Sequence, residues 1–245
     1  MPDVPHLIDS PEAMLDAIRH FGIIPFFHNA VSGWSIEDLT APGCWFGDEN
    51  DGGSLGPWDW KIDTVRAGDI AYGKYLGGKA AFATFEWYRH LMNWRRSLPQ
   101  HKLAEGGHPE FLLEAIKKNG SLQAQEMRAL LKPRIPDIKK QTVDSLLQHL
   151  EMGTWAVIGD FTRVYRGPNL VYSGWQRSSV TTPDELFKPC VSSGGESEPF
   201  WAKFIDNGPV SELPSCSPEE SRETLITHIR SLFPDATRKT IEKMI

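Results

Sequence analysis

The sequence predicts an α+β fold in which a central module of three helices and a hairpin is flanked by two other regions. Three observations predict it. Apolar residues recur at helical spacing in three stretches between residues 109 and 152. Strand-forming residues then lie on both sides of the turn Gly167-Pro168-Asn169. An irregular, tryptophan-rich α+β region precedes the module, and a segment with helical periodicity follows it.

The N-terminal region, residues 1–107, is expected to start its ordered structure with a helix. Ser10 supplies an N-cap oxygen, Pro11 fits the first helical position, and Glu12 complements the positive helix end. Residues 30–61 are rich in Gly, Pro and Trp and are expected to be irregular, with an exposed turn at 48–53. The other expected elements are a buried strand at 23–27, a hairpin of strands 70–75 and 79–85, and a helix at 86–96.

The central region, residues 108–180, is expected to hold the three helices and the second hairpin. Gly120 ends the first helix, Ser121 caps the second, and Pro133 stops it. The predicted helices cover residues 109–119, 122–131 and 137–152, and the predicted strands cover 154–158 and 170–175. In this order the elements predict a winged helix-turn-helix module from Pro109 to Trp175.

The C-terminal region, residues 181–245, is expected to be a helical segment. Thr182-Pro183-Asp184-Glu185 is typical of a capped helix start, and Ser217-Pro218-Glu219-Glu220 predicts a helix that reaches Phe233. Residues 191–198, rich in Ser, Gly and Glu, are expected to form a linker, and residues 235–245 a last short helix.

The composition is that of an ordinary folded protein, with 40% hydrophobic and 24% charged residues. No apolar run approaches the roughly 18 residues of a membrane span, and the N-terminus lacks a signal-peptide pattern, so a cytoplasmic location without a membrane partner is expected. Cys44, Cys190 and Cys216 are expected to be ordinary thiols, because they lie far apart and form no CxxC.

The charge is distributed unevenly along the chain. The net charge is −6, yet residues 61–140 hold 15 lysines and arginines against 8 aspartates and glutamates. A basic centre of this kind favours a polyanionic partner when its charges share one face. The nucleic-acid-binding candidates on the third helix and the hairpin are Lys139, Lys140, Gln141, Thr142, Ser145, Gln148, Arg163 and Arg166. The alternative is a solvated helix face in a module that contacts protein.

The N-terminal part is dense in tryptophan. Its members are Trp34, Trp45, Trp58, Trp60, Trp87 and Trp94. Core packing explains such a set without any ligand, and this interpretation leads. The alternative is a pocket in which an extruded base stacks between aromatic walls, as enzymes acting on bases require. The residues expected to line that pocket are Trp58, Trp60, Lys61, Lys74 and Arg89.

Asp59 and Glu86 are the catalytic candidates, because they are the carboxylates nearest these aromatic residues in the sequence. A carboxylate beside aromatic walls can have a raised pKa and act as an acid or a base. A structural ion pair of Glu86 with Lys74 or Arg89 is the alternative, and spacing does not decide between them. The histidines form no metal-binding pair, and Walker, GxGxxG and GxSxG motifs are absent, so no metal and no cofactor are expected.

Segments in order along most of the chain carry a family resemblance. They are Phe21-Gly22-Ile23-Ile24-Pro25-Phe26-Phe27, Trp34-Ser35-Ile36-Glu37-Asp38-Leu39-Thr40, Gly56-Pro57-Trp58-Asp59-Trp60-Lys61, Tyr72-Gly73-Lys74, Asn93-Trp94-Arg95-Arg96, Ala156-Val157-Ile158-Gly159-Asp160-Phe161, Tyr172-Ser173-Gly174-Trp175 and Thr181-Thr182-Pro183-Asp184-Glu185. The sequence resembles the AlkZ-related winged-helix family, uncharacterised proteins of bacteria and fungi that are distantly similar to the AlkZ alkylpurine DNA glycosylases. The resemblance implies winged-helix ancestry and double-stranded DNA as a partner.

The AlkZ glycosylases are built from tandem winged-helix domains and carry a catalytic Gln-x-Gln motif in their N-terminal part. The only such motif here is Gln123-Ala124-Gln125, expected inside the second helix of the module with its side chains facing solvent. The resemblance therefore does not extend to glycosylase activity.

Three functions follow. The leading one is a DNA-binding winged-helix protein, a divergent or degenerate relative of base-excision DNA glycosylases. The others are a non-enzymatic protein-interaction module and an enzyme acting on a small molecule in the tryptophan-lined region. Whether the protein is an enzyme stays open at this point.

Overall fold

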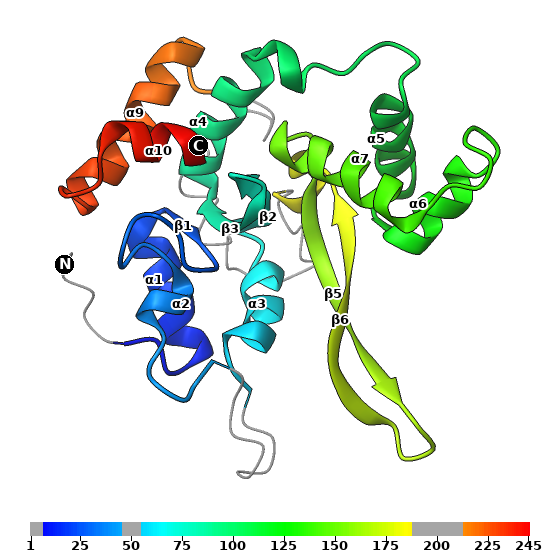
Figure 1. Cartoon of the computed structure of the whole chain (residues 1–245), viewed down its shortest axis with the longest axis horizontal. Helices are drawn as coiled ribbons and strands as arrows, with labels where there is room; N and C mark the ends of the chain where they lie inside the picture. Colours follow the sequence, from blue (N-terminus) through cyan, green and yellow to red (C-terminus); the bar gives the residue numbers. More distant parts are fainter. Residues whose placement is uncertain (1–6, 46–54, 188–212) are drawn as a thin grey trace, which may run out of the picture.

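The computed structural model describes residues 7–45, 55–187 and 213–245 of the chain. It confirms the expected α+β class, with a single antiparallel sheet and helices around it (Figure 1). The turn expected at 48–53, the linker expected at 191–198 and Cys190 lie outside the described residues. No helix in the described ranges combines the length and the apolar character that crossing a bilayer requires.

The sheet has six strands in the order β1-β3-β2-β5-β6-β4. The strands are β1 (Ile23–Pro25), β2 (Ile70–Leu76), β3 (Lys79–Thr84), β4 (Leu122–Gln123), β5 (Val157–Arg166) and β6 (Val171–Thr181). β2 and β3 form the predicted hairpin, with Tyr72 opposite Phe82. The link between the N-terminal strands and the second hairpin is the pairing of Tyr72 with Ile158. Tyr72 is therefore central to the sheet.

The first helices are α1 (Pro11–Phe21), α2 (Ile36–Leu39), α3 (Pro57–Arg66) and α4 (Phe85–Ser97). The predicted cap is present, since the Ala13 amide donates to the Ser10 hydroxyl at 3.1 Å. The expectation that residues 30–61 are irregular is wrong for α2 and for the start of α3. In α3 the Gly56-Pro57 pair begins the helix and the interior side is apolar, so the dipeptide is a helix start.

The central helices are α5 (His108–Asn119), α6 (Ala124–Leu131) and α7 (Lys140–Met152), after a short 3-10 helix η1 (Pro99–His101). α6 begins two residues later than expected, because Leu122 and Gln123 pair with β6 instead. Gln123 then caps α6, and its amide donates to Glu126 at 2.7 Å. Of the Gln-x-Gln pair, Gln123 is thus at the helix boundary and Gln125 is exposed.

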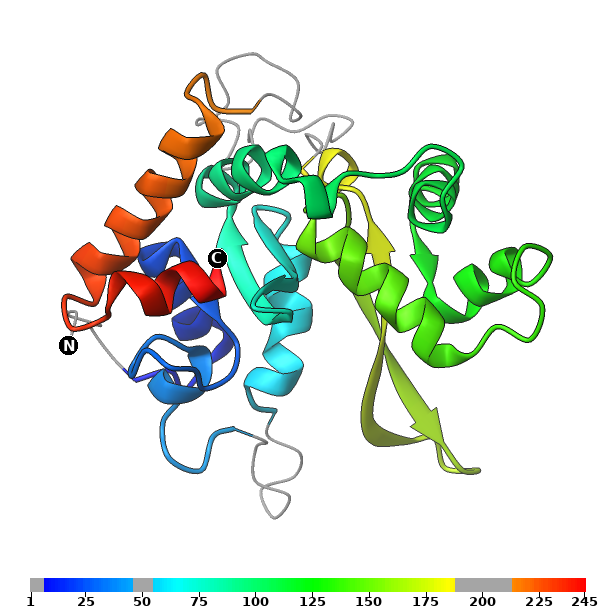
Figure 2. The same cartoon turned by 45° about the horizontal axis from the view of Figure 1, so that its top comes forward.

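The β5–β6 hairpin is longer than the sequence predicts and extends away from the rest of the described chain (Figures 1 and 2). Gly174 was expected near the end of a strand. It has φ 72° and lies at an irregularity of the pairing, between the pairs Arg163–Gln176 and Tyr165–Tyr172. The strand continues through this bulge because glycine adopts positive φ without strain.

The C-terminal helices are α8 (Pro183–Leu186), α9 (Pro218–Leu232) and α10 (Arg238–Met244). α9 lies against α4 (Figure 1), where the Asn93 amide donates to the Ser221 hydroxyl at 2.9 Å. The buried apolar side chains form one continuous core. Trp34 and Trp60 belong to that core, as the packing interpretation of the tryptophans expects.

Candidate active-site cavity beside the hairpin

A cavity of about 240 Å³ lies where α3, β2, the end of α7 and the β5–β6 hairpin meet. Aromatic side chains and a few ionisable groups share its wall. The lining residues are Trp58, Lys61, Tyr72, Gly73, Lys74, Ala80, Glu151, Ile158, Phe161, Trp175, Gln176 and Ser178. A mostly apolar cavity with a few converging polar groups is the usual form of a small-ligand site.

Helix α3 brings Trp58 and Lys61 to the cavity from one face, because residues three apart share a side of a helix. The position of the helix start is fixed by Gly56. A Cβ atom there would overlap the backbone carbonyl oxygens of Cys44 and Trp45. The local sequence therefore sets both where α3 begins and which side chains it presents.

The amine of Lys61 is buried against aromatic rings. Its Nζ donates to the backbone carbonyl of Trp58 and lies 3.7 Å from the centre of the Trp58 ring. Phe161 lies further off, with its ring centre 5.2 Å from Nζ. Burial lowers the pKa of Lys61 to about 7, although the negative charge of Asp59 acts to raise this pKa. The Lys61 amine is consequently neutral in a large fraction of the molecules near neutral pH.

Glu151, from the C-terminal end of α7, is only 3% exposed and lies on the same cavity. Its Oε2 accepts a hydrogen bond from the backbone amide of Lys74 at 2.8 Å. Burial raises the pKa of Glu151 to about 7, although the Lys74 amide and charge favour the carboxylate. The cavity thus holds an amine and a carboxyl group that both change charge near neutral pH, a property typical of acid–base sites.

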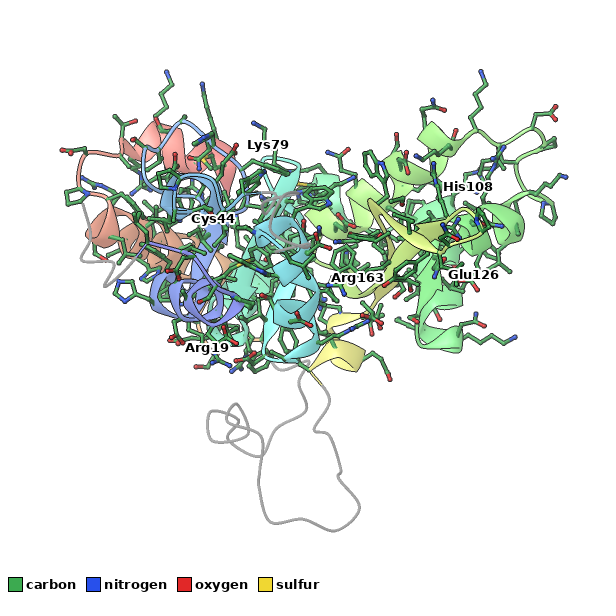
Figure 3. All side chains as sticks on the ribbon, turned by 90° about the horizontal axis from the view of Figure 1, so that it is seen from below. Arg19, Cys44, Lys79, His108, Glu126 and Arg163 are labelled. Atoms are coloured by element: carbon green, nitrogen blue, oxygen red, sulfur yellow. The ribbon has the colours of Figure 1, made fainter. Side chains whose placement is uncertain are left out.

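Asp59 lies beside this cavity and has structural partners. Its Oδ1 accepts from the Tyr172 hydroxyl at 2.7 Å and from the Gln176 amide at 2.8 Å. The Arg163 guanidinium lies 3.6 Å from the same oxygen. Because the two hydrogen-bond donors and the arginine all come from the hairpin, Asp59 holds the hairpin on α3. Figure 3 shows Arg163 on the side of the hairpin that faces α3.

The other residues expected in a pocket are placed elsewhere. Trp60 is in the core, and the Arg89 guanidinium lies 5.5 Å from the Phe85 ring centre. Glu86 is exposed on α4 and does not line the cavity. Of the expected pocket residues, the structure therefore brings together Trp58, Lys61 and Lys74.

The remaining tryptophans of the N-terminal part have separate packing partners. Trp45 lies against Phe26, with ring centres 5.1 Å apart. Trp87 stacks on His228 at 3.6 Å, and the Arg222 guanidinium lies 5.2 Å from the Trp94 ring centre. The contacts of Trp87 and Trp94 join α4 to α9, so these tryptophans stabilise the fold.

The candidate nucleic-acid residues divide into two groups. Those exposed at the start of α7 and in the hairpin are Lys139, Lys140, Gln141, Ser145 and Arg166. Gln148, further along α7, is also exposed, and its side-chain amide lies 3.4 Å from the Gly78 carbonyl at the β2–β3 turn. Thr142 and Arg163 are half-buried. The exposed candidates on α7 thus extend from its N-cap, Lys139, to Gln148.

Sequence reasoning missed nine of the twelve lining residues, among them Tyr72, Glu151, Trp175 and Gln176. Trp175 carried a usable signal, because a tryptophan in a polar hairpin is not needed for a core, and it is 63% exposed here. Glu151 carried none. It comes directly after the last apolar position of its helix, Leu150, and lies about ninety residues from Lys61 in the sequence.

Comparison with known proteins gives one match. The sequence model of the family described as AlkZ related matches residues 8–245. No curated protein and no solved structure matches the chain. The match includes α3, α7 and the hairpin, and therefore every element that lines the cavity.

Proposed function

The chain belongs to the AlkZ-related family, and on this premise we propose that it is a DNA-binding protein of winged-helix type, a divergent relative of base-excision DNA glycosylases. One observation carries the proposal. The projecting β5–β6 hairpin, with its arginines and exposed apolar side chains, also forms part of the wall of a cavity that holds an acid–base pair. A groove-contacting element beside a small-ligand site is the arrangement that an enzyme acting on an extruded base requires.

The order of elements in the central region supports the winged-helix part of the proposal. The chain runs α5, β4, α6, α7, β5 and β6, and the short β4 pairs with β6. Three helices, a short strand and a terminal hairpin in this order are typical of winged helix-turn-helix modules, in which the third helix enters a major groove. We assign this role to α7 and the wing to the hairpin, within a domain of residues 108–180.

The hairpin supplies the chemistry of a DNA contact. It contains Arg163, Arg166 and Arg177 and a single acidic residue, Asp160. Arginine is the residue that binds phosphate in a bidentate manner. The exposed apolar side chains of the hairpin are Tyr165, Leu170, Val171 and Trp175, between 52% and 71% exposed. Such side chains suit contact with sugars and base edges, which a purely phosphate-binding surface does not need.

The start of α7 supports a second contact. Lys139 is the N-cap residue and Lys140 the first helical residue, and the first turn holds no acidic residue. Positive side chains at the positive end of a helix dipole slightly destabilise the protein when no anion is bound. An anion bound there offsets this cost, because lysines and free helix amides both favour phosphate.

The cavity supports the relationship to base excision. Its aromatic residues include Trp58, Tyr72 and Trp175, and its volume of about 240 Å³ suits a single planar ring system. Glu151 supplies a carboxyl group of raised pKa that can protonate a leaving base or activate water. Since Gln123 caps α6, the reaction would use this cavity and not the Gln-x-Gln pair.

Titration of the protein with a fluorescent 20-base-pair duplex at several salt concentrations tests the binding. We expect the logarithm of the association constant to fall linearly with the logarithm of the salt concentration, by about 0.9 for each phosphate contact. Replacing Lys139 and Lys140 together, or Arg166 alone, by alanine should weaken binding and reduce this slope. Lys239→Ala is the matched control, because Lys239 is an exposed lysine of α10. Absence of duplex binding at low salt contradicts the proposal.

A non-enzymatic protein-interaction module is the second candidate. The observation that favours it is the same exposed apolar set on the hairpin, which includes Leu170 at 71% and Val171 at 65% exposed. Binding to a protein partner through this surface would be weakened by Leu170→Ser and would show little dependence on salt. Duplex binding with a counterion-release slope would instead exclude this as the main role.

A further inference from the structure

The amine of Lys61 is a feature of the cavity that base binding alone does not explain. An aromatic face for stacking and polar groups for hydrogen bonding to a base are already present on the cavity wall in Trp58, Gln176 and Glu151. Lys61 is instead 2% exposed, and among the described residues no carboxylate pairs with its amine within 4.0 Å. Burying an unpaired amine is costly, so its retention in a cavity wall points to chemistry.

We propose that Lys61 Nζ is a nucleophile that condenses with an aldehyde in this cavity and forms an imine. Two features of its geometry prepare the amine for this step. The backbone carbonyl of Trp58 accepts one N–H, which orients the group, and the Trp58 ring lies 3.7 Å from Nζ on one side. The neutral amine has a second N–H and a lone pair that this hydrogen bond does not use, and Lys61 lines the cavity.

The step balances without an oxidant or a reductant. The Nζ lone pair attacks the carbonyl carbon, the C–N bond forms as the C=O π bond opens, and one proton moves from the nitrogen to the oxygen to give a carbinolamine. The nitrogen then loses a proton, the hydroxyl group leaves as water with a proton supplied by an acid, and a C=N bond remains. The products are one imine and one water molecule.

Glu151 is the group on the same cavity that can deliver that proton. Its carboxyl group is buried and held in place by the Lys74 amide at 2.8 Å. Burial favours the protonated carboxyl group, just as burial favours the neutral form of the Lys61 amine. Near neutral pH the cavity therefore offers a nucleophile and an acid at the same time, a combination that free side chains in water do not reach.

Aldehydes of two sources share this chemistry. One is a small free aldehyde that enters the cavity. The other is the open-chain sugar aldehyde that remains in DNA after a base has been removed, and this source rests on the proposed DNA-binding function. The cavity volume of about 240 Å³ accommodates a pentose from either source.

Reductive trapping with cyanoborohydride at pH 7 tests the inference, because this reagent reduces imines to stable secondary amines. In one arm the whole protein is treated with glyceraldehyde, and in the other with a duplex that contains one abasic site. Peptide mass spectrometry then compares Lys61 with Lys79, an exposed lysine of β3. We expect Lys61 to be modified at least about tenfold faster in one arm or both, since an exposed lysine is almost fully protonated at this pH.

The Lys61→Met variant should lose the adduct, and Lys79→Met should keep it. Methionine retains the length and apolar contacts of the buried stem, and a thermal melt checks that the variant folds. The inference is overturned if Lys61 reacts no faster than Lys79 in both arms, or if the dominant adduct lies on Lys74 at the cavity wall. Labelling by glyceraldehyde alone supports the Lys61 chemistry and excludes the abasic source. Duplex binding is measured separately. If the protein does not bind duplex DNA, the result of the glyceraldehyde arm still tests the Lys61 chemistry.

Discussion

The Tyr172 hydroxyl donates a hydrogen bond of 2.7 Å to Asp59, and this contact ties the tip-side half of the hairpin to α3. Asp59 is 6% exposed and Tyr172 is half-buried, so the bond is partly shielded from water. Trp175, which lines the cavity, lies three residues further along β6. The hairpin that carries the proposed DNA contact is therefore also the one that lines the cavity.

Tyr172→Phe is expected to destabilise the protein by about 1–2 kcal/mol, the usual effect of removing a hydrogen bond to a carboxylate. Gln176 and Arg163 remain near Asp59 and limit the loss. Urea unfolding measures it, and hydrogen exchange should show faster exchange in β6. Tyr165→Phe is the control, because Tyr165 is 52% exposed on the same hairpin. An equal effect of both variants would contradict the role given to Asp59.

Glu151 should make the protein less stable as the pH rises from about 4.5 to about 7. Its pKa is about 7 in the folded protein and 4.5 as the ordinary value, so in this window the unfolded state binds fewer protons than the folded state. The loss reaches at most about 3 kcal/mol. Glu151→Gln, which still accepts from the Lys74 amide, should remove this slope in urea titrations at pH 4.5, 6 and 7.5. An unchanged slope would show that Glu151 ionises normally.

Lys61 should have the opposite effect at higher pH. Its pKa falls from 10.5 to about 7 in the folded protein, so between these values the unfolded state binds more protons and stability rises with pH. Lys61→Met should flatten the curve of unfolding free energy between pH 7 and 10. Lys79→Met should leave it as in the unmodified protein, because Lys79 is exposed. A curve that is flat in the unmodified protein contradicts a depressed lysine pKa.

Gly56→Ala is expected to destabilise the protein by about 1–3 kcal/mol, because the new methyl group overlaps the carbonyl oxygens of Cys44 and Trp45. The helix start must then shift, and Lys61 shifts with it. Thermal melts measure the stability, and trapping by glyceraldehyde measures the displacement of the amine. Gly73→Ala is a milder change, since its nearest side-chain atom lies 3.4 Å away on Tyr75. Equal stability of both variants would contradict the fixed start of α3.

If the cavity removes bases, incubation with alkylated duplex DNA should create abasic sites. Glu151→Gln should lower the rate by roughly a hundredfold or more, the usual size of a general acid–base contribution. Glu86→Gln is the control, because Glu86 is exposed on α4 and outside the cavity. An equal loss in both variants would argue against Glu151, and no abasic sites with any variant would leave a binding function alone.

Local sequence signals predicted the helices and strands well wherever the decisive residues are neighbours. Ser10 with Pro11 marks the start of α1, and Ser217 with Glu220 forms a capping box at α9. The same reasoning missed α3, although Gly56-Pro57 is a helix start, because the density of tryptophan and glycine suggested irregular chain. It also placed Gln123 inside a helix, since pairing with β6 is invisible in the local sequence.

The sequence by itself determined the class of the fold and the basic centre of the chain, and it gave Trp58, Lys61 and Lys74 as pocket residues only as the alternative to core packing. Only the tertiary structure decided that Glu151 and Trp175 join them. The sheet connects the two halves through Tyr72 and Ile158, and this pairing brings the end of α7 and the hairpin to α3. The depressed pKa of Lys61 and the raised pKa of Glu151 follow from that burial, because desolvation depends on everything that surrounds a group and not on its neighbours in sequence.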